Sequence, residues 1–423
     1  MPIHLPQSAT GARRSGPKET VVLLAGLMAL NAFAIDAMIP ALPAIGNDLG
    51  VRTENFRQLV VVAYFFGFGV GQIFWGPLAD RFGRKPILAT GVALYTGFAL
   101  LCSVAGSFEL LIASRIAMGA SAAVTRVLVT AMIRDIFEGE EMARVMSLVF
   151  MVFMLVPVLA PNIGQLILLF APWRAIFILL AAYALAMLAW SWRRLPETLH
   201  PEFRRSLDWR QTSSAILETI RDPLSRGYTL AMTVSFSALV AYISSIQQIV
   251  FDAFHEGRFI GLVFASIAAP MAVASYLNSR VVGRFGLRRV GHTAALAFMI
   301  VTAVHAAVAL AGLETLRTFI VLQGLTMGCF AFTSSNLGTL AMEHMAPIAG
   351  TASSVQGVVG TVGAALIGFL IGQQFDGTPV PFVVGTALCA AGGFLLIVLT
   401  EPKRLFARIE SREEPPCIAE DFG

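Results

Sequence analysis

Long apolar segments, separated by short polar ones, repeat along the whole chain. A helix needs about 20 apolar residues to cross the roughly 30 Å of hydrocarbon in a bilayer. Twelve windows of this kind occur in the sequence, at residues 20–42, 58–79, 86–106, 110–133, 145–170, 174–192, 227–250, 259–280, 290–312, 318–342, 349–373 and 379–400. The pattern therefore predicts an all-α membrane protein with twelve transmembrane helices.

The longest polar segment divides these windows into two sets of six. Residues 193–226 carry seven Arg and lie between the sixth and seventh windows. We expect two six-helix lobes, at residues 20–192 and 227–400, joined by a cytoplasmic linker and flanked by tails at 1–19 and 401–423. A weakly apolar helical face within the linker fits either a helix on the membrane surface or a solvated tether. That face comprises Trp209, Ile216, Leu217 and Ile220.

Composition and charge support the membrane assignment and give it an orientation. The chain is 57% hydrophobic and 13% charged, whereas soluble domains carry about 25% charged residues. With both termini in the cytoplasm, 23 of the 30 Lys and Arg lie on the cytoplasmic side or at that end of a window, five lie on or at the outer side, and two lie in the interior of a window. This asymmetry predicts cytoplasmic termini, and it explains the net charge of +4 without nucleic-acid binding. The first apolar run exceeds the core of a signal peptide, about 7 to 15 residues, and is expected to be a retained span.

Motifs of soluble catalysis are absent from the sequence. The four Cys show no paired spacing, so neither a disulfide framework nor a metal site is expected. No phosphate-binding glycine loop with Lys, no paired metal motif and no nucleophile elbow occurs. We therefore expect no enzymatic activity and no cofactor, and energy from an ion gradient rather than from ATP.

Three charges lie inside the predicted spans: Asp36, Arg115 and Arg126. A charge near mid-membrane costs about 2.5 to 3.5 kcal/mol on insertion scales, so each needs a partner or a water-filled cavity. Asp36 and Arg115 lie at nearly the same depth, and Arg126 is about three turns further inward. An Asp that alternates between an Arg-paired and a drier setting changes its proton affinity. This predicts proton coupling by Asp36 and Arg115; the alternative is a buried ion pair that only fixes helix packing.

The stretch GPLADRFGRKP, residues 76–86, concentrates charge between the second and third spans. Asp80 ends a helix whose dipole disfavours a negative charge, so it needs a neighbouring cation or the N-terminus of another helix. Gly76 and Gly83 allow close helix approach and a tight turn. The basic residues Arg81, Arg84 and Lys85 hold the turn on the cytoplasmic side. They could serve only as topological anchors, a role that does not explain Asp80.

A similar stretch occurs once more, as RFGLR at residues 284–288 against RFGRK at 81–85, an offset of 203 residues. The same loop at the same place in two six-span halves indicates an internal duplication, as in many transporters. Gly283 stands where Asp80 stands in the first half. The second copy is therefore expected to preserve the turn and the positive charge but to lack the acid.

Other polar and kink-forming residues are candidates for gating and binding. In span five, Pro157, Pro161 and Gly164 indicate a kink that flexes a gate, or simply close packing. A mostly apolar cavity with a few polar groups suits amphipathic small molecules, although polar residues also hold helices together. Candidates for its lining are Asn31, Phe33, Tyr242, Gln247 and Asn336. His305 is expected to be a packed, hydrogen-bonded ring.

GPLADRFGRKP resembles the signature of the major facilitator superfamily. Further stretches narrow the resemblance: IDAMIPALPAI (35–45), SRIAMGASAA (114–123), IRDIF (133–137), VPVLAPNIG (156–164), RLPETL (194–199) and IAGTASS (348–354). Together they resemble the drug:proton antiporters of the Bcr/CflA type, from about residue 20 to 400. The fifth-span motif of that group usually ends in two glycines after its proline, whereas Asn162 and Gln165 depart from it here.

The resemblance implies a two-lobed transporter of the bacterial inner membrane that works by alternating access. Protons entering through Asp36 would drive export of drug-like amphipathic molecules, Arg115 would tune that acid, and the loop around Asp80 would latch the inner gate. Because Gly283 replaces the acid, the second half is expected to lack an equivalent latch. We expect membrane lipid, protons and the small-molecule substrate as partners, no nucleic acid, and a functional monomer. The alternatives are a dedicated exporter or importer of one metabolite, a channel, or a membrane-bound enzyme.

Overall fold

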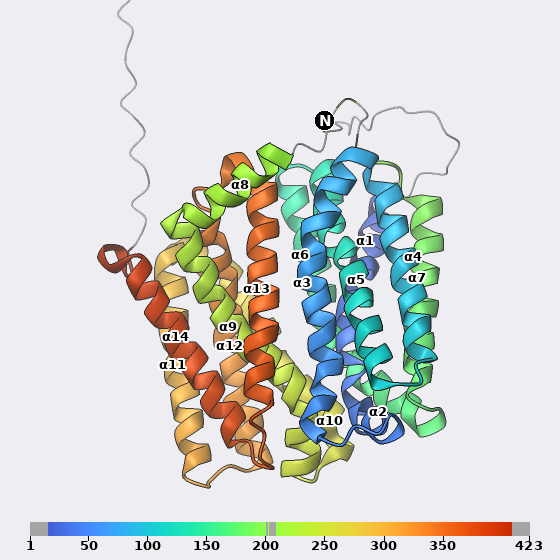
Figure 1. The fold of residues 1–423 in the computed structure, drawn as a ribbon. Coiled ribbons are helices and arrows are strands. Elements are labelled where there is room, and N and C mark those ends of the chain that lie inside the picture. The colour runs from blue at the N-terminus through green and yellow to red at the C-terminus, as the bar shows by residue number, and fades with distance from the viewer. Residues whose placement is uncertain (1–15, 200–201, 203–208, 408–423) are drawn as a thin grey trace, which may run out of the picture.

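The computed structural model describes residues 16–199, 202 and 209–407, and they form a bundle of long helices (Figure 1). The first lobe consists of α1 (Pro17–Asp36), α2 (Leu42–Asp48), α3 (Leu59–Phe82), α4 (Arg84–Ser103), α5 (Phe108–Ile136), α6 (Gly139–Phe170) and α7 (Arg174–Arg194). The second lobe consists of α9 (Pro223–Gln248), α10 (Ile260–Phe285), α11 (Leu287–Leu310), α12 (Leu316–Ala341), α13 (Ala349–Gly372) and α14 (Val380–Thr400). Between them lies α8 (Trp209–Arg221).

Each predicted span coincides with one long helix. Within the described residues, eleven helices are long and apolar enough to cross a membrane. The twelfth window, 145–170, falls within the single helix α6, whose described apolar part is Val156–Leu168. The prediction of an all-α, multi-pass membrane protein is confirmed.

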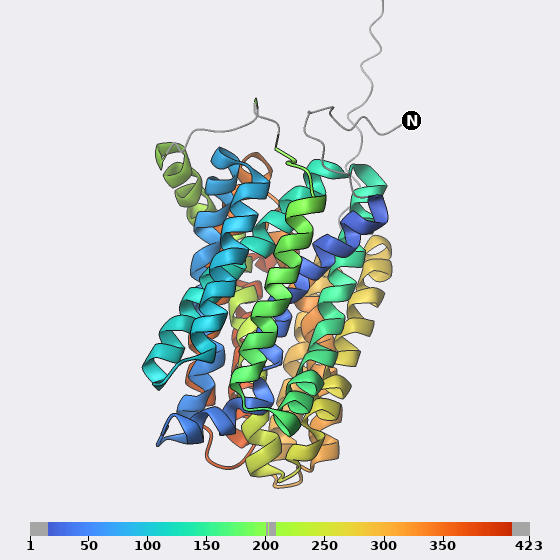
Figure 2. The ribbon, with the colours of Figure 1, turned by 90° about the vertical axis from the view of Figure 1, so that its right-hand side faces the viewer.

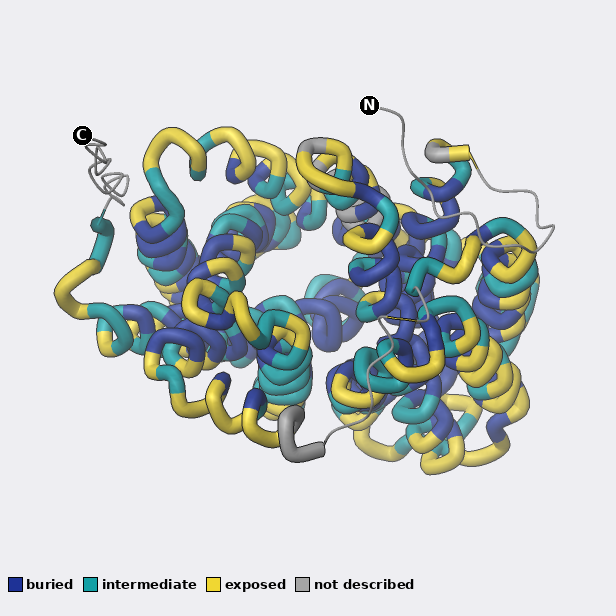
Figure 3. The backbone as a smooth tube through the Cα atoms, turned by 90° about the horizontal axis from the view of Figure 1, so that it is seen from above, coloured by how far each residue is buried: buried dark blue, intermediate teal, exposed yellow. Residues whose placement is uncertain are grey.

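The helices run between two ends of the molecule. We call the end that carries α8 and the Gly83 turn the linker end, and the end that carries α2 the distal end (Figure 1). Figure 2 views the first lobe from outside, and Figure 3 looks onto the linker end, where the two lobes lie side by side. The lobes meet along two seams, α3 against α13 and α6 against α10.

Small residues let the helices of the first lobe approach closely. A Cβ added to Gly67 of α3 would lie 1.9 Å from the carbonyl oxygen of Ile116 on α5. One added to Gly119 of α5 would lie 2.1 Å from the carbonyl oxygen of Tyr64 on α3. Close approach of this kind stabilises helix pairs in lipid, where the hydrophobic effect offers no driving force between them.

The two loops of the sequence repeat adopt the same backbone turn. Gly83 has φ 103° and ψ 152°, and Gly286 has φ 88° and ψ 151°. Glycine alone adopts this region without a steric penalty. The shared turn, at the offset of 203 residues seen in the sequence, supports the duplication.

The polar linker contains the helix that its apolar face suggested. Helix α8 packs against α9 and α13 at the linker end, while Leu217 and Ile220 remain 45% and 47% exposed. The side chain of Trp209 lies outside the described residues. The segment is thus a helix docked on the second lobe, with an apolar face that remains uncovered.

Candidate functional site

Asp36 is the last residue of α1 and is only 3% exposed. Its Oδ1 atom has no hydrogen-bond partner, and no described residue forms an ion pair with it. The C-terminal end of a helix disfavours a negative charge, and the last turn of α1 contains no basic residue. In this state the carboxyl group therefore has no counter-charge.

In the state described here, Arg115 does not pair with Asp36. Its Nε donates to the carbonyl oxygen of Val60 (2.8 Å) and its Nη1 to that of Ala34 (3.1 Å). The guanidinium also stacks over the ring of Tyr64, with its Cζ 4.5 Å from the ring centroid. Arg115 thus ties α5 to α1 and α3 through Nε and Nη1, while its Nη2 has no hydrogen-bond partner among the described residues.

Tyr242 lies near Asp36, on the opposite lobe. It lies on α9, is 2% exposed, and its hydroxyl has no hydrogen-bond partner. The phenol lies within electrostatic range of Asp36, and its ring packs on Phe264 at 5.4 Å between centroids. Of the five residues predicted to line a cavity, Tyr242 is therefore the one that the structure brings to the acid.

Three of the other four predicted cavity residues form contacts within their own lobe. The Asn31 Nδ2 donates to Thr125 (2.6 Å) within the first lobe, and Phe33 stacks on Tyr183 of α7, 6.0 Å between ring centroids. Asn336 donates to Asn278 (2.8 Å) within the second lobe. These contacts are the interhelical packing that polar and aromatic residues provide in membrane bundles. The fourth, Gln247, is fully buried, and neither side-chain polar atom has a partner.

Side-chain amides close the seam between the lobes at the distal end. Gln248 donates to the Oδ1 of Asn55 (2.8 Å) and accepts a bond from Gln58, which also reaches the carbonyl oxygen of Gly372 (3.1 Å). Gln373 donates to the backbone oxygen of Asn55 (2.9 Å). We call Asn55, Gln58, Gln248 and Gln373 the distal amide cluster. Sequence analysis missed this cluster, although Gln58, Gln248 and Gln373 each lie at the distal end of a predicted window.

The two residues that depart from the fifth-span motif add to this closure. The Nδ2 of Asn162 donates to the carbonyl oxygen of Gly261 (3.4 Å), and the Nε2 of Gln165 to that of Arg258 (3.3 Å). Both acceptors belong to the second lobe. The two amides therefore connect α6 to the start of α10.

Gly164 packs α6 against the end of α1. A Cβ at this position would lie 2.1 Å from the carbonyl oxygen of Ala37, the residue after Asp36. Helix α6 continues through Pro157 and Pro161 without interruption. In this state Gly164 thus serves close packing next to the acid.

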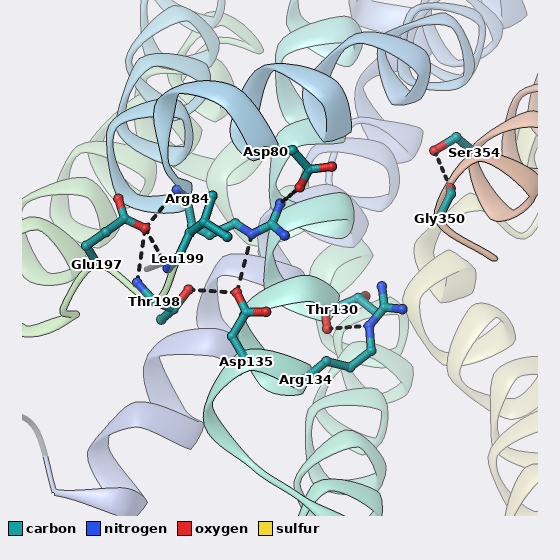
Figure 4. A network of polar contacts seen from close by, with 10 residues as sticks. All are labelled: Asp80, Arg84, Thr130, Arg134, Asp135, Glu197, Thr198, Leu199, Gly350 and Ser354. Carbon is teal, nitrogen blue, oxygen red and sulfur yellow. Dashed lines mark hydrogen bonds and ion pairs between the residues drawn. The ribbon is translucent and has the colours of Figure 1, made fainter. Parts of the chain in front are cut away.

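The loop around Asp80 forms a charged network inside the first lobe (Figure 4). Asp80 pairs with Arg84 (2.5 Å), which also reaches Asp135 of α5 (3.3 Å). Arg84 thus supplies the cation that Asp80 was expected to need. The Glu197 carboxylate accepts bonds from the backbone N–H groups of Arg84 (2.9 Å) and Lys85 (3.2 Å), and so caps α4.

The remaining residues of this loop have smaller roles. The guanidinium of Arg81 lies over the ring of Phe82, and the ammonium of Lys85 over that of Trp192. A Cβ at Gly76 would meet only Val127, at 3.8 Å, so close approach does not require glycine there in this state.

The second loop also takes part in a charged network, which lies within the second lobe. Arg288 of the second loop pairs with Glu343 (2.7 Å) and Glu401 (2.8 Å), and the Tyr228 hydroxyl donates to Glu401 (2.6 Å). Burial alone would raise the pKa of Glu401, but the bonds from Arg288 and Tyr228 outweigh it and hold the pKa below its usual range. These acids follow the ends of α12 and α14 rather than lying in the loop. Arg288 therefore has acidic partners although Gly283 stands where the first loop has Asp80.

Hydrogen bonds join the lobes at the distal end and at mid-helix. Every hydrogen bond between the lobes that involves described residues lies either near the distal end or at mid-helix. The one at mid-helix joins the Gln72 Nε2 of α3 to Thr361 of α13 (3.3 Å). At the linker end, Figure 4 shows Arg134 on α5 and Ser354 on α13 without a contact between them. Among the described residues, the hydrogen bonds between the lobes thus lie on the distal side of mid-helix and at mid-helix itself.

Comparisons with known proteins agree on one family. The family model described as Major Facilitator Superfamily matches residues 24–355. A bicyclomycin resistance protein homolog of Haemophilus influenzae is 30% identical over 400 residues, covering 92% of this chain and 97% of the relative. The multidrug resistance protein MdtL of Escherichia coli is 28% identical over 389 residues, covering 91% and 96%. The crystal structure of a D-xylose-proton symporter matches with a TM-score of 0.70 at 13% identity, covering 89% of this chain and 96% of that one.

Proposed function

Because the chain belongs to the major facilitator superfamily, we propose that it is a proton-coupled exporter of drug-like amphipathic small molecules. The names of its relatives support export, since they refer to resistance against bicyclomycin and against multiple drugs. The observation that carries the coupling is Asp36, buried without a counter-charge beside Tyr242 of the other lobe. A rocking motion that separates the lobes distally would change the surroundings of this carboxyl group most.

Asp36 is the proton carrier in this proposal. In the distally open state it takes a proton from the outer solution, and in the state described here it gives the proton up toward the linker end as the cargo binds. Arg115 is a positioning residue, because its bond to the Ala34 carbonyl holds the last turn of α1 in place. Alternating access around a site near mid-membrane is the general mechanism of such two-lobed folds.

The proposal includes an orientation and a location. The linker end carries the basic residues of the Gly83 and Gly286 turns and of α8, and short cytoplasmic loops are enriched in Lys and Arg. We assign the linker end to the cytoplasm and the protein to the bacterial inner membrane, as a monomer. The state described here is then inward-open.

Asp80 latches the inner gate in the outward-open state of this proposal. Its side chain is 41% exposed at the linker end, and the N-terminus of α13 lies across the seam (Figure 4). A helix N-terminus attracts a carboxylate, so closure at the linker end would bring the two together. Asp80→Asn should slow transport while leaving the protein folded. Full activity in this variant would remove the latch from the proposal.

Transport in proteoliposomes with an imposed pH gradient tests the coupling. Ethidium, chloramphenicol and a carboxylated fluorophore serve as probes, with and without the gradient. Asp36→Asn is expected to abolish uphill transport, whereas Asp376→Asn, a matched change in the exposed distal loop, should leave it intact. Uphill transport by correctly inserted Asp36→Asn would refute the assignment. Transport of one probe class alone would favour the dedicated exporter, and uptake instead of export would favour the importer.

A further inference from the structure

Arg126 is a charge at mid-membrane depth for which the mechanism above has no use. It lies ten residues from the linker end of α5, or about 15 Å at 1.5 Å per residue. This is half of the roughly 30 Å hydrocarbon thickness. No described acid pairs with it, and its guanidinium lies over the ring of Phe68, 6.0 Å from Cζ to the centroid. Such a charge requires a water-filled space or an anion.

The Arg126 side chain faces the interior of the bundle. It shares a face of α5 with Arg115, eleven residues away, whose guanidinium reaches Ala34 of α1 and Val60 of α3. Arg126 therefore points toward the same two helices, three turns nearer the linker end. Phe68, over which it lies, is buried. Yet Arg126 itself is exposed, although protein atoms crowd around it, so it borders an accessible space between helices.

The position of Arg126 relative to Asp36 follows from one hydrogen bond. Asn31 of α1 bonds to Thr125, the neighbour of Arg126 (2.6 Å). Asp36 lies five residues further along α1, about 7.5 Å nearer the distal end. Neither side chain is in electrostatic contact with the other. A molecule that engages Arg126 would therefore lie nearer the linker end than Asp36.

A second exposed arginine leads from the linker end toward this position. Arg126, Thr130 and Arg134 follow one another at one-turn spacing on the same face of α5. Arg134 is exposed, and among the described residues its Nε bonds to the backbone oxygen of Thr130 (3.4 Å). The acids nearby, Asp80 and Asp135, are already paired with Arg84. The accessible charge along this face is therefore positive.

We propose that Arg126 binds a carboxylate or similar acidic group of the cargo, which would make amphipathic organic anions the preferred substrate class. The guanidinium offers several donors in a planar fork that matches a carboxylate, and the ring of Phe68 supplies an apolar surface beside it. This inference rests on the proposed export function and specifies its substrate.

A set of probes with one apolar body tests the proposal. Binding of 1-pyrenebutanoate, its primary amide and 1-pyrenebutylamine is measured by energy transfer from tryptophan in full-length protein in nanodiscs, with empty nanodiscs subtracted. Trp75 is a suitable donor, because its indole N–H bonds to the Ala120 carbonyl on α5 (2.7 Å). Wild-type protein is expected to bind the butanoate at least about tenfold more tightly than the amide, as for a charge-assisted hydrogen bond.

The variants separate a binding role from a structural one. Arg126→Gln should remove the preference for butanoate and leave the affinity for the amide within about threefold. Arg126→Lys should keep part of the preference, because it retains the charge but not the fork. Arg280→Gln, which removes an exposed arginine from α10, should change nothing. A wild-type protein without the preference, or an Arg126→Gln protein that keeps it, would overturn the proposal.

Two further outcomes distinguish this inference from the proposed function. If the protein prefers butanoate but moves no probe under a pH gradient, the export function fails and the Arg126 site stands. If it exports the amine and the amide uphill and binds the butanoate no better, the function stands and the Arg126 site fails. Should Arg126→Gln not fold, the wild-type preference and the Arg126→Lys variant decide.

Discussion

The distal amide cluster sets the balance between the two ends of the molecule, and Gln58→Leu tests this. Gln58 lies at the start of α3, is fully buried, and bonds to Gln248 and to the Gly372 carbonyl across the seam. Each buried hydrogen bond contributes a net 0.5 to 1.5 kcal/mol, roughly. Loss of both should shift the equilibrium toward the distally open state by about 1 to 3 kcal/mol, or about 5- to 150-fold in the population ratio.

Distances between labels on the two lobes measure this shift. Arg52→Cys and Gln374→Cys introduce exposed positions at the distal end of each lobe, in a background without the four native cysteines. Double electron–electron resonance between spin labels on these two cysteines should show that a longer distance becomes populated in Gln58→Leu. Gln165→Leu removes a single, longer bond and should shift the distribution less. An unchanged distribution in Gln58→Leu would refute the role of the cluster.

Two further predictions concern packing and pH. Gly164→Ala forces a Cβ against the Ala37 carbonyl and should lower the free energy of unfolding by about 1 to 3 kcal/mol and slow transport. Thermal unfolding measures the loss of stability. In that assay Gly283→Ala, whose added Cβ would meet nothing within 4 Å, should leave the stability unchanged. Because the pKa of Glu401 lies below its ordinary 4.5, its bonds to Arg288 stabilise the fold at neutral pH, and this contribution is lost as the pH falls below that value. Glu401→Gln should therefore reduce thermal stability at pH 7 by about 1 to 3 kcal/mol, and its difference from wild type should narrow in acid; a constant difference would contradict the assignment.

The number and location of the helices followed from the sequence because the bilayer imposes a minimum length on each apolar run. The glycine turn also followed, since RFG recurs at a fixed offset and positive φ leaves little choice of residue. Depth along a helix could be counted in the same way, and it correctly set Asp36, Arg115 and Arg126 apart as interior charges. These features depend on one segment at a time.

Partners across the bundle could not be predicted in this way. Depth placed Arg115 level with Asp36 but said nothing of the Val60 and Ala34 carbonyls, because every residue carries such an acceptor. The acids that pair with Arg288 lie 55 and 113 residues away in the chain. No local sequence pattern could therefore predict these ion pairs. The repeat predicted a second loop without an acid, and it could not indicate that Glu343 and Glu401 pair with Arg288 instead.

His305 offers the sharpest test of the idea that proton coupling resides in the first lobe. It contacts Glu314, and both side chains are almost completely buried. The contact joins α11 to the segment before α12, and the imidazole packs edge-on against Phe319 of α12, 5.6 Å between ring centroids. All of these groups belong to one lobe, so a rocking motion between lobes would carry the pair along without changing its surroundings. His305→Gln should therefore lower thermal stability but leave the pH dependence of transport unchanged, whereas Asp36→Asn should abolish that dependence. A shifted pH profile in His305→Gln would instead assign a second proton site to the second lobe.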